Sequence, residues 1–291
     1  PFERSGISRP SFVSKEDGTL LAFCDDQQGT DLKVTSVLLD PYGKFISEQH
    51  RFLTKYGCGY QKADALWTGS RMFFTWRSES YGAEGWINDV WFGVADAGGN
   101  NLWEKKLRTD GMLDADLAYG HGRALMVVPI RTDFDPMNGN RGKTHLAVHR
   151  FDVDGNEIRE PLILEPMAGV EFGTSFIAPT KDGWLIVAST SMATSRYYLA
   201  RLTPDGSLVS GPDLVNTGSD VFFVDMIPYG GGAVALLSGY LNHYSDFSKV
   251  LFFEADGSLR QEWNAGEYMG LGGVIAHKGR LFMLYTAASQ D

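Results

Sequence analysis

One turn returns five times along this chain at nearly constant spacing. It reads as Asp40-Pro-Tyr-Gly43, Asp96-Ala-Gly-Gly99, Asp152-Val-Asp-Gly155, Thr203-Pro-Asp-Gly206 and Glu254-Ala-Asp-Gly257. Successive glycines of this D-x-x-G turn are 56, 56, 51 and 51 residues apart. A period of about 50 residues marks a repeat architecture, so the chain is predicted to fold as a series of similar units.

A second glycine turn lies upstream in each repeat and precedes a short apolar run. These turns are Asp17-Gly18, Thr68-Gly69, His121-Gly122, Asp182-Gly183, Gly230-Gly-Gly232 and Lys278-Gly279. The apolar runs after them occupy residues 19–24, 72–76, 124–128, 184–188, 233–237 and 281–285. Such runs indicate strands that are covered on both faces. A more alternating strand follows, then the D-x-x-G turn, then a polar strand such as 45–53, 102–108 or 157–164.

Each repeat therefore reads as four short antiparallel strands, A to D, which is the pattern of a β-propeller blade. We predict an all-β fold, a single propeller domain over residues 1–291, with five four-stranded blades and a partial sixth. The propeller is thus five- or six-bladed. The predicted blades span about 5–54, 55–109, 110–166, 167–216 and 217–268, with the partial blade at 269–291.

The first repeat resembles the blade unit of secreted bacterial β-propeller repeat proteins. It combines Arg9-Pro-Ser-Phe, Asp17-Gly-Thr-Leu-Leu-Ala-Phe and Leu39-Asp-Pro-Tyr-Gly43 in the order of that unit, and residues 63–76 fit the same pattern. The resemblance implies a fold and a secreted, periplasmic or cell-surface location, but no activity. The same residues are more weakly similar to the first blade of sialidases. Here Arg9-Pro10 lacks the intervening Ile of the sialidase motif, and none of the five turns forms an S-x-D-x-G-x-x-W box.

Charge and composition restrict the partners. A net charge of -10 at pH 7 disfavours nucleic acid and anionic membrane surfaces, because both bind basic patches. No apolar run approaches the roughly 18 residues of a membrane-spanning helix, so no membrane insertion is predicted. Walker A, C-x-x-C and dinucleotide signatures are absent from the sequence, so no cofactor is predicted. The chain starts at Pro1 without Met or signal peptide, and we expect a trimmed mature form.

The connections between strands B and C are the predicted ligand-binding part of the molecule, because loops on a rigid scaffold usually carry function. These connections are longest in the second and third repeats, at residues 77–86 and 131–141, and the fifth repeat places 240–244 there. The predicted ligand-binding residues are Arg77, Tyr81, Trp86, Arg131, Tyr240 and His243. A pocket rimmed by such side chains suits a glycan. The alternative is that these connections are solvated loops whose aromatic side chains bind no ligand.

Acidic residues recur in the predicted A strands. Asp64, Asp116, Ser175 and Asp225 fall at comparable positions. They have two interpretations: carboxylates that bond backbone N–H groups of neighbouring blades, or a carboxylate pair for acid–base chemistry on a glycosidic bond. Asp64, Asp116, Asp225 and the loop residue His243 are therefore the candidate catalytic residues, His243 as a lyase-type base.

Metal binding is not predicted. Asp133, Asp135, Asn138 and Asn140 alternate oxygen side chains, but their spacing lacks the twelve-residue calcium loop and its closing Glu. His145 and His149 share a strand face but lie about 13 Å apart, too far for one ion. Cys24 and Cys58 are expected on the same rim of neighbouring blades, either bridged in an oxidising compartment or as buried free thiols.

These features favour an extracytoplasmic, non-catalytic binding or adhesion module, with a glycan or another protein as its partner. A carbohydrate-active enzyme, either a glycoside hydrolase or a polysaccharide lyase, is the first alternative. A scaffold for protein–protein assembly is the second.

Overall fold

The computed structural model of the chain is built of strands. It describes residues 8–15, 18–25, 33–40, 46, 51–52, 64–82, 85–108, 115–135, 140–167, 171–190, 196–216, 220–241, 245–267, 269–277 and 279–287. No helix occurs among these residues. All six apolar runs lie within strands, namely β2, β6, β10, β14, β18 and β22. The predicted all-β class is confirmed.

The strands form five four-stranded antiparallel sheets and one two-stranded sheet, numbered here in chain order. The first sheet contains β1 (Ser8–Lys15), β2 (Gly18–Asp25), β3 (Lys33–Leu39) and β4 (Arg51–Phe52). The second contains β5 (Asp64–Trp67), β6 (Met72–Gly82), β7 (Gly85–Ala95) and β8 (Asn101–Arg108). The third contains β9 (Asp116–Gly120), β10 (Arg123–Asp135), β11 (Asn140–Phe151) and β12 (Leu162–Leu164).

The remaining sheets follow the same order along the chain. The fourth contains β13 (Phe172–Thr180), β14 (Gly183–Thr190), β15 (Arg196–Leu202) and β16 (Leu208–Asn216). The fifth contains β17 (Asp220–Tyr229), β18 (Gly232–Leu241), β19 (Ser245–Phe253) and β20 (Leu259–Glu267). In the described part of the chain, the sixth contains two strands, β21 (Met269–His277) and β22 (Arg280–Ala287).

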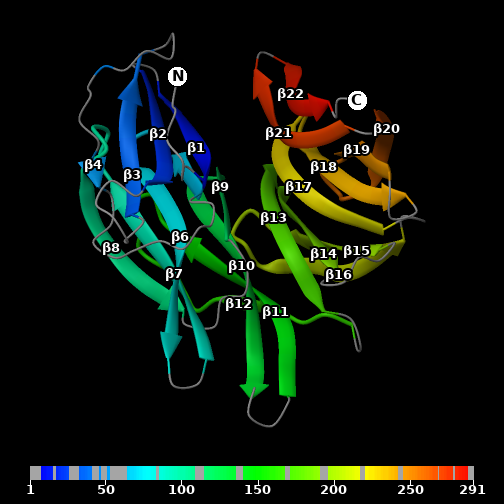
Figure 1. Cartoon of the computed structure of the whole chain (residues 1–291), viewed down its shortest axis with the longest axis horizontal. Coiled ribbons are helices and arrows are strands. Elements are labelled where there is room, and N and C mark those ends of the chain that lie inside the picture. The colour runs from blue at the N-terminus through cyan, green and yellow to red at the C-terminus, as the bar shows by residue number, and fades with distance from the viewer. Residues whose placement is uncertain are drawn as a thin grey trace. The chain divides into compact units, whose positions relative to one another are not determined.

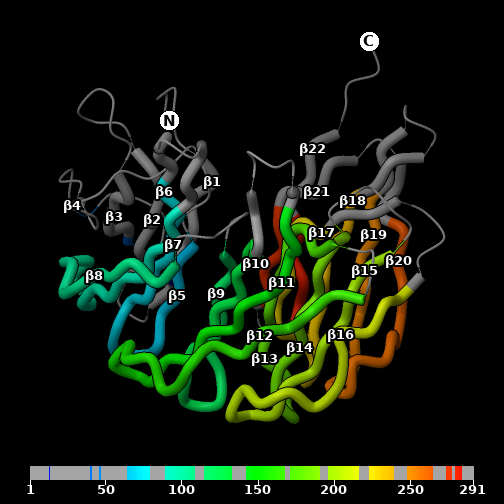
Figure 2. Tube along the Cα trace, turned by 90° about the horizontal axis from the view of Figure 1, so that it is seen from below, coloured from blue at the N-terminus to red at the C-terminus, as the bar shows by residue number. Residues whose placement is uncertain are grey.

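The chain divides into two compact units. The first comprises Pro1–Lys143 and His149–Glu160, and the second comprises Thr144–Val148 and Pro161–Asp291. Within the second unit the fourth, fifth and sixth sheets succeed one another, since β13 contacts β17 and β17 contacts β21 (Figure 1). Within the fifth sheet, β17, β18, β19 and β20 lie side by side in chain order (Figure 2).

The core of the second unit lies between neighbouring sheets. One face of the fourth sheet, with Ala178, Leu185 and Val187, packs on Ala233 and Ala235 of the fifth. The opposite face of the fifth sheet packs on the sixth through a second cluster that includes Val234, Leu236 and Val274. Both faces of β18 are therefore apolar, which explains its near-continuous apolar run in the sequence.

The D-x-x-G turn has one geometry in the four repeats whose turns are described. The N–H of the turn's first residue donates to the carbonyl of the residue after the glycine, and the glycine N–H donates back to the first residue. In the third repeat these bonds join Asp152 to Asn156 at 2.9 Å and Gly155 to Asp152 at 3.1 Å. The repeat spacing in the sequence thus reports a repeated turn.

The turn glycine also meets the preceding sheet. Gly155 has φ +89°, and a Cβ there would lie 2.5 Å from a Val94 methyl group and 2.9 Å from Trp103. Gly257 is similar, with φ +81° and a Cβ position 3.1 Å from Leu199. Glycine is required here for backbone conformation and for close packing together.

Two expectations differ from the structure. Residues 77–82 and 85–86 are not loop but the paired ends of the long hairpin β6–β7 (Figure 1), and 131–135 likewise extend β10. Pairing satisfies backbone groups that a loop of that length would leave to water. The expected strand 157–164 is reduced to β12, because Glu157 forms a single bridge with Phe151 and Pro161 has no N–H to donate.

Candidate functional site

The predicted ligand-binding residues lie on the hairpins that join the second and third strands. Arg77 is in β6, paired with Val90 of β7, and is 5% exposed. Arg131 is in β10 and is half-buried. Tyr81 is opposite Trp86 in the β6–β7 hairpin, and Tyr240 is opposite Asp246 in β18–β19. The structure thus places these five on hairpins, with Arg77 in the interior rather than on an open rim.

Several other predicted residues fall outside the described part of the chain. These are His243, Asn138 and Cys58. Asp133 and Asp135 belong to β10, Asn140 begins β11, and Cys24 is in β2 opposite Val34. The predicted convergence on one cavity, the calcium alternative and the Cys24–Cys58 bridge all stay predictions.

Asp64 on the first strand of the second sheet bonds the next sheet. Its Oδ1 accepts the N–H of Ala65 at 3.0 Å, and its Oδ2 accepts the N–H of Leu117 in β9 at 2.9 Å. The carboxylate is buried. Asp64 therefore ties its own strand to the inner strand of the following sheet.

Asp225 repeats this arrangement in the second unit. Its Oδ1 accepts the N–H of Met226 at 2.8 Å, and its Oδ2 accepts the N–H of Val274 in β21 at 3.0 Å. The two aspartates hold the same register, since Asp64 is opposite Thr75 and Asp225 is opposite Leu236 of the second strand. The bond to a neighbouring N–H is thus a repeated structural device.

Ser175 does not share that register. In the fourth sheet Ser175 is opposite Ala188 and Phe176 is opposite Val187. Counted from the turn, Phe176 holds the place of Asp225. Ser175 is therefore one residue farther from its hairpin turn than Asp64 and Asp225 are from theirs.

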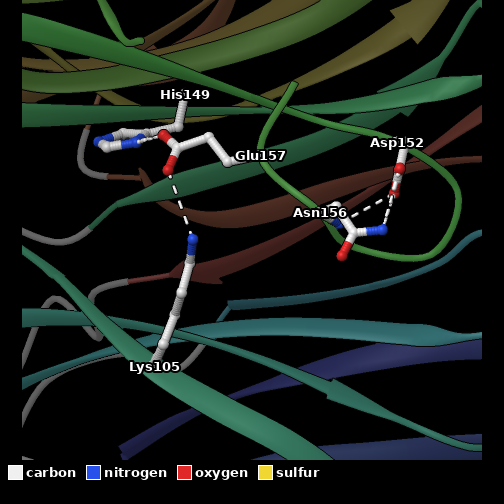
Figure 3. Close-up of polar contacts among 5 residues, drawn as sticks. All are labelled: Lys105, His149, Asp152, Asn156 and Glu157. Carbon is white, nitrogen blue, oxygen red and sulfur yellow. Dashed lines mark hydrogen bonds and ion pairs between the residues drawn. The ribbon is translucent and has the colours of Figure 1, made fainter. Parts of the chain in front are cut away.

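A second polar cluster joins the second and third sheets within the first unit (Figure 3). Nδ1 of His149 in β11 lies 2.7 Å from Oε1 of Glu157, and Nζ of Lys105 in β8 lies 3.4 Å from Oε2 of the same carboxylate. A carboxylate only accepts hydrogen bonds, so Nδ1 carries the proton and its N–H donates the hydrogen bond to Glu157. The three residues form a chain from the half-buried Lys105 to the buried His149.

Aromatic packing encloses the histidine. His149 is 2% exposed, and its ring lies parallel to Phe151 at 6.3 Å between centroids. Phe151 in turn stacks on Phe92 of β7 at 4.0 Å. Nε2 of His149 is buried and has no hydrogen-bond partner among the described residues. The cluster therefore orients one imidazole nitrogen and leaves the other in an apolar enclosure.

Electrostatics hold Glu157 in its charged form. The hydrogen bond from His149 lowers the pKa of Glu157 below its ordinary value, burial opposes this, and the charges of His149 and Lys105 lower it further. In the adjacent turn, burial raises the pKa of Asp152, but hydrogen bonds from Asn156, Asp154 and Gly155 outweigh it, so the net shift is downward. Both carboxylates are thus held as anions by their neighbours.

Sequence reasoning missed this cluster, although a signal was present. Two residues after the turn glycine, Glu157 stands where Leu208 and Leu259 stand in the next two repeats. This position is apolar in three of the five repeats (Phe45, Leu208 and Leu259) and is Asn101 in the second, so Glu157 is the one charged residue there.

No group of three or more His, Cys, Asp or Glu side chains within the described ranges could hold a metal ion. In the same part of the chain, no helix is long and apolar enough to cross a membrane.

Comparison with known structures decides the fold. The chain is similar to Trypanosoma rangeli sialidase in complex with the inhibitor DANA, with a TM-score of 0.56 and 11% identity, over 100% of this chain and 56% of the sialidase. It is also similar to the subtype N10 neuraminidase-like protein of A/little yellow-shouldered bat/Guatemala/060/2010, with a TM-score of 0.55 and 10% identity, over 92% and 85%. The fold is a β-propeller.

Other comparisons agree with this fold. Residues 180–208 match the family described as "Domain of unknown function (DUF5122) beta-propeller". The exo-β-1,3-galactanase of Phanerochaete chrysosporium in complex with β-1,3-galactotriose aligns with a TM-score of 0.52 and 12% identity, over 96% of this propeller and 66% of the galactanase. Comparison with curated proteins finds no match. The resemblance to β-propeller repeat proteins is confirmed, and structural relatives of the propeller include sialidases and glycoside hydrolases.

Proposed function

We propose that the chain is a non-catalytic β-propeller module that acts outside the cytoplasm and binds glycans. The site we assign is formed by the β6–β7 and β10–β11 hairpins of the first unit, with Tyr81, Trp86 and Arg131; Arg77 is 5% exposed and is not assigned a ligand contact. Tyr240 of β18 and His243, which lies outside the described residues, are further candidates, to be tested separately.

One observation carries the non-catalytic part of the proposal. Asp64 and Asp225 each use both carboxylate oxygens to accept backbone N–H groups, one of them in the next sheet. Hydrolysis of a glycosidic bond needs two carboxyl groups that flank the substrate, one of them protonated. Carboxylates committed to holding neighbouring blades together are poorly suited to that work.

The glycan part of the proposal rests on residue types and on structural relatives. Aromatic side chains with nearby guanidinium groups suit the apolar faces and hydroxyl groups of a sugar. Two relatives of the same fold are described with carbohydrate ligands or analogues, the sialidase with sialic acid and the galactanase with β-1,3-galactotriose.

A glycan array probed with the whole chain tests the ligand class. We expect saturable binding that Trp86→Ala weakens about tenfold, which is the loss of an aromatic contact worth about 1.4 kcal/mol. Trp263→Ala is the matched control, because Trp263 is an exposed tryptophan on β20 of the other unit. Binding to no glycan, or equal loss in both variants, contradicts the assigned site.

An assay for released sugar tests the absence of catalysis on every glycan that binds. We expect no turnover from the wild-type chain. Release of reducing ends or unsaturated products that Asp64→Asn or Asp116→Asn abolishes would make the enzyme alternative correct.

A further inference from the structure

The outer strands of three sheets are interrupted, whereas the central strand pairs are regular. The second and third strands pair without a register shift in the first, second, fourth and fifth sheets. The third and fourth strands pair with two register shifts in each of the second, fourth and fifth sheets. The pairs of first and second strands have at most one. The irregularities thus concentrate on β8, β16 and β20, each of which ends its sheet within the described residues.

The interruption nearest the D-x-x-G turn has one form in these three sheets. In the second sheet Ala95 is opposite Asn101, and the preceding residue, Val94, is opposite Trp103. One step along β7 is therefore matched by two steps along β8, and Leu102 has no opposite residue. An extra residue of this kind in one strand of an antiparallel pair is a β-bulge. The same count gives one bulge residue to the fourth sheet and one to the fifth, Val209 and Arg260.

The bulge residue has a fixed place in the repeat. It is the third residue after the turn glycine, and this place is apolar in the first four repeats and is Arg260 in the fifth. The four apolar side chains are all exposed, namely Ile46, Leu102, Ile158 and Val209. An apolar residue that is exposed in four repeats does not serve the core, so its place in the repeat has another cause.

Strand β16 shows what the bulge prevents. Its first two residues, Leu208 and Val209, are exposed, and no charged residue lies between Asp205 and Asp213. An open strand edge that is apolar and uncharged is a template for another strand. A bulge bends the strand and increases its twist, so that a second strand cannot follow the edge. Pro212 acts in the same direction farther along, because it has no N–H to offer.

We propose that the bulge residues Leu102, Val209 and Arg260 keep the outer edges of these sheets from pairing with a second copy of this chain. The excluded partner is the same outer strand of another copy in antiparallel direction, since a twofold axis pairs identical edges in that way. Because each bulge inserts one residue, its removal leaves the later pairs of the strand in place. Trp103 stays opposite Val94. The inference does not depend on the proposed function.

Deletion of Val209 from the full chain tests the proposal by sedimentation. We expect the wild-type chain to stay monomeric and the deletion variant to associate, with a weight-average mass that approaches or exceeds twice that of one chain as the concentration rises. Hydrogen exchange at the amides of β16 should slow with concentration in the variant alone. The deletion removes an exposed valine, so association driven by apolar surface alone predicts the opposite result.

Val209→Ala is the matched control, because it removes apolar surface but keeps the bulge. It should stay monomeric. Deletion of Leu102 repeats the test independently on β8 and should also cause association. In the chain that lacks Val209, Leu208→Lys should restore the monomer, because a lysine on the edge disfavours strand addition.

Four results would overturn the proposal. The first is self-association of the wild-type chain through β16. The second is a pair of folded deletion variants that both stay monomeric. The third is association of Val209→Ala as strong as that of the deletion variant, since apolar surface would then be the cause. The fourth is loss of folded structure in both deletion variants by circular dichroism, since the bulge residues would then serve the fold itself. The glycan array measures a separate property, so none of these results bears on the proposed glycan site.

Discussion

At the scale of single residues, the turn glycines combine two constraints that are usually separate. Gly155 has a positive φ and also lies where a Cβ would meet Val94 and Trp103 of the preceding sheet. Gly122 has a similar φ of +70°, but nothing lies within 4 Å of its Cβ position. The pair separates the cost of backbone conformation from the cost of packing.

Substitution of these two glycines by alanine should therefore differ in effect. We expect Gly122→Ala to lower the free energy of unfolding by about 1–2 kcal/mol, the cost of a left-handed conformation. Gly155→Ala should lower it by about 1–3 kcal/mol more, because the added methyl group overpacks the contact with the second sheet. Urea denaturation measures both, and equal losses would show that the contact at Gly155 adapts without cost.

The carboxylate of Glu157 should make stability depend on pH. Its pKa is lowered in the folded chain, mainly by the hydrogen bond from His149, so the unfolded chain binds the proton more tightly. The stabilisation is complete above the ordinary pKa of 4.5 and is lost as the pH falls through the lower pKa of the folded chain.

Unfolding by urea at a series of pH values tests this sign. Glu157→Gln should reduce the loss of stability below pH 4.5, and Lys105→Gln should have a smaller effect in the same direction, because the charge of Lys105 contributes less than His149. A variant Glu157→Gln that keeps the full acid sensitivity of the wild-type chain would refute the assignment.

At the scale of strands and sheets, neighbouring blades are joined by polar bonds at their inner strands as well as by apolar faces. Asp64 and Asp225 each reach one residue of the next inner strand, Leu117 and Val274. The N–H of Leu117 is in a buried setting, so removal of its acceptor leaves an unsatisfied donor.

Asp64→Ala should therefore lower the free energy of unfolding by about 1–3 kcal/mol, with Asp64→Asn less severe because its amide oxygen still accepts one bond. Hydrogen exchange of the Leu117 amide should rise in both variants. Asp154→Asn is the control, since Asp154 is exposed and lies on a turn. Unchanged exchange at Leu117 would show that the bond does not hold the two strands.

At the scale of the whole molecule, the predicted bridge between Cys24 and Cys58 links the first repeat to the second. Cys24 lies in β2, whereas Cys58 lies outside the described residues. If the bridge forms, it closes a loop of about 35 residues, and its loss should lower the free energy of unfolding by about 3–4 kcal/mol.

Alkylation of the unfolded chain followed by intact-mass measurement decides the matter. We expect no free thiol in protein produced under oxidising conditions and two free thiols after reduction. Cys24→Ser and Cys58→Ser should then lower stability equally. Two free thiols before reduction would identify the cysteines as unbridged.

The sequence by itself determined the repeat, the turns and the all-β class, because each depends on neighbours along the chain. A glycine with positive φ after three turn residues, and an apolar run of strand length after a glycine pair, are local signals with local causes. They predicted β2, β6, β10, β14, β18 and β22 correctly. They also predicted carboxylates on inner strands.

Only the tertiary structure decided what those residues contact. The partner of Asp64 is 53 residues away and the partner of Lys105 is 52 residues away, on strands brought together by sheet packing. Ser175, which the sequence aligned with the aspartates, lies one residue farther from its hairpin turn than they do from theirs. Strand pairing turned expected loops into hairpin ends. Contacts of this kind follow from packing between sheets, and a period along one chain does not encode them.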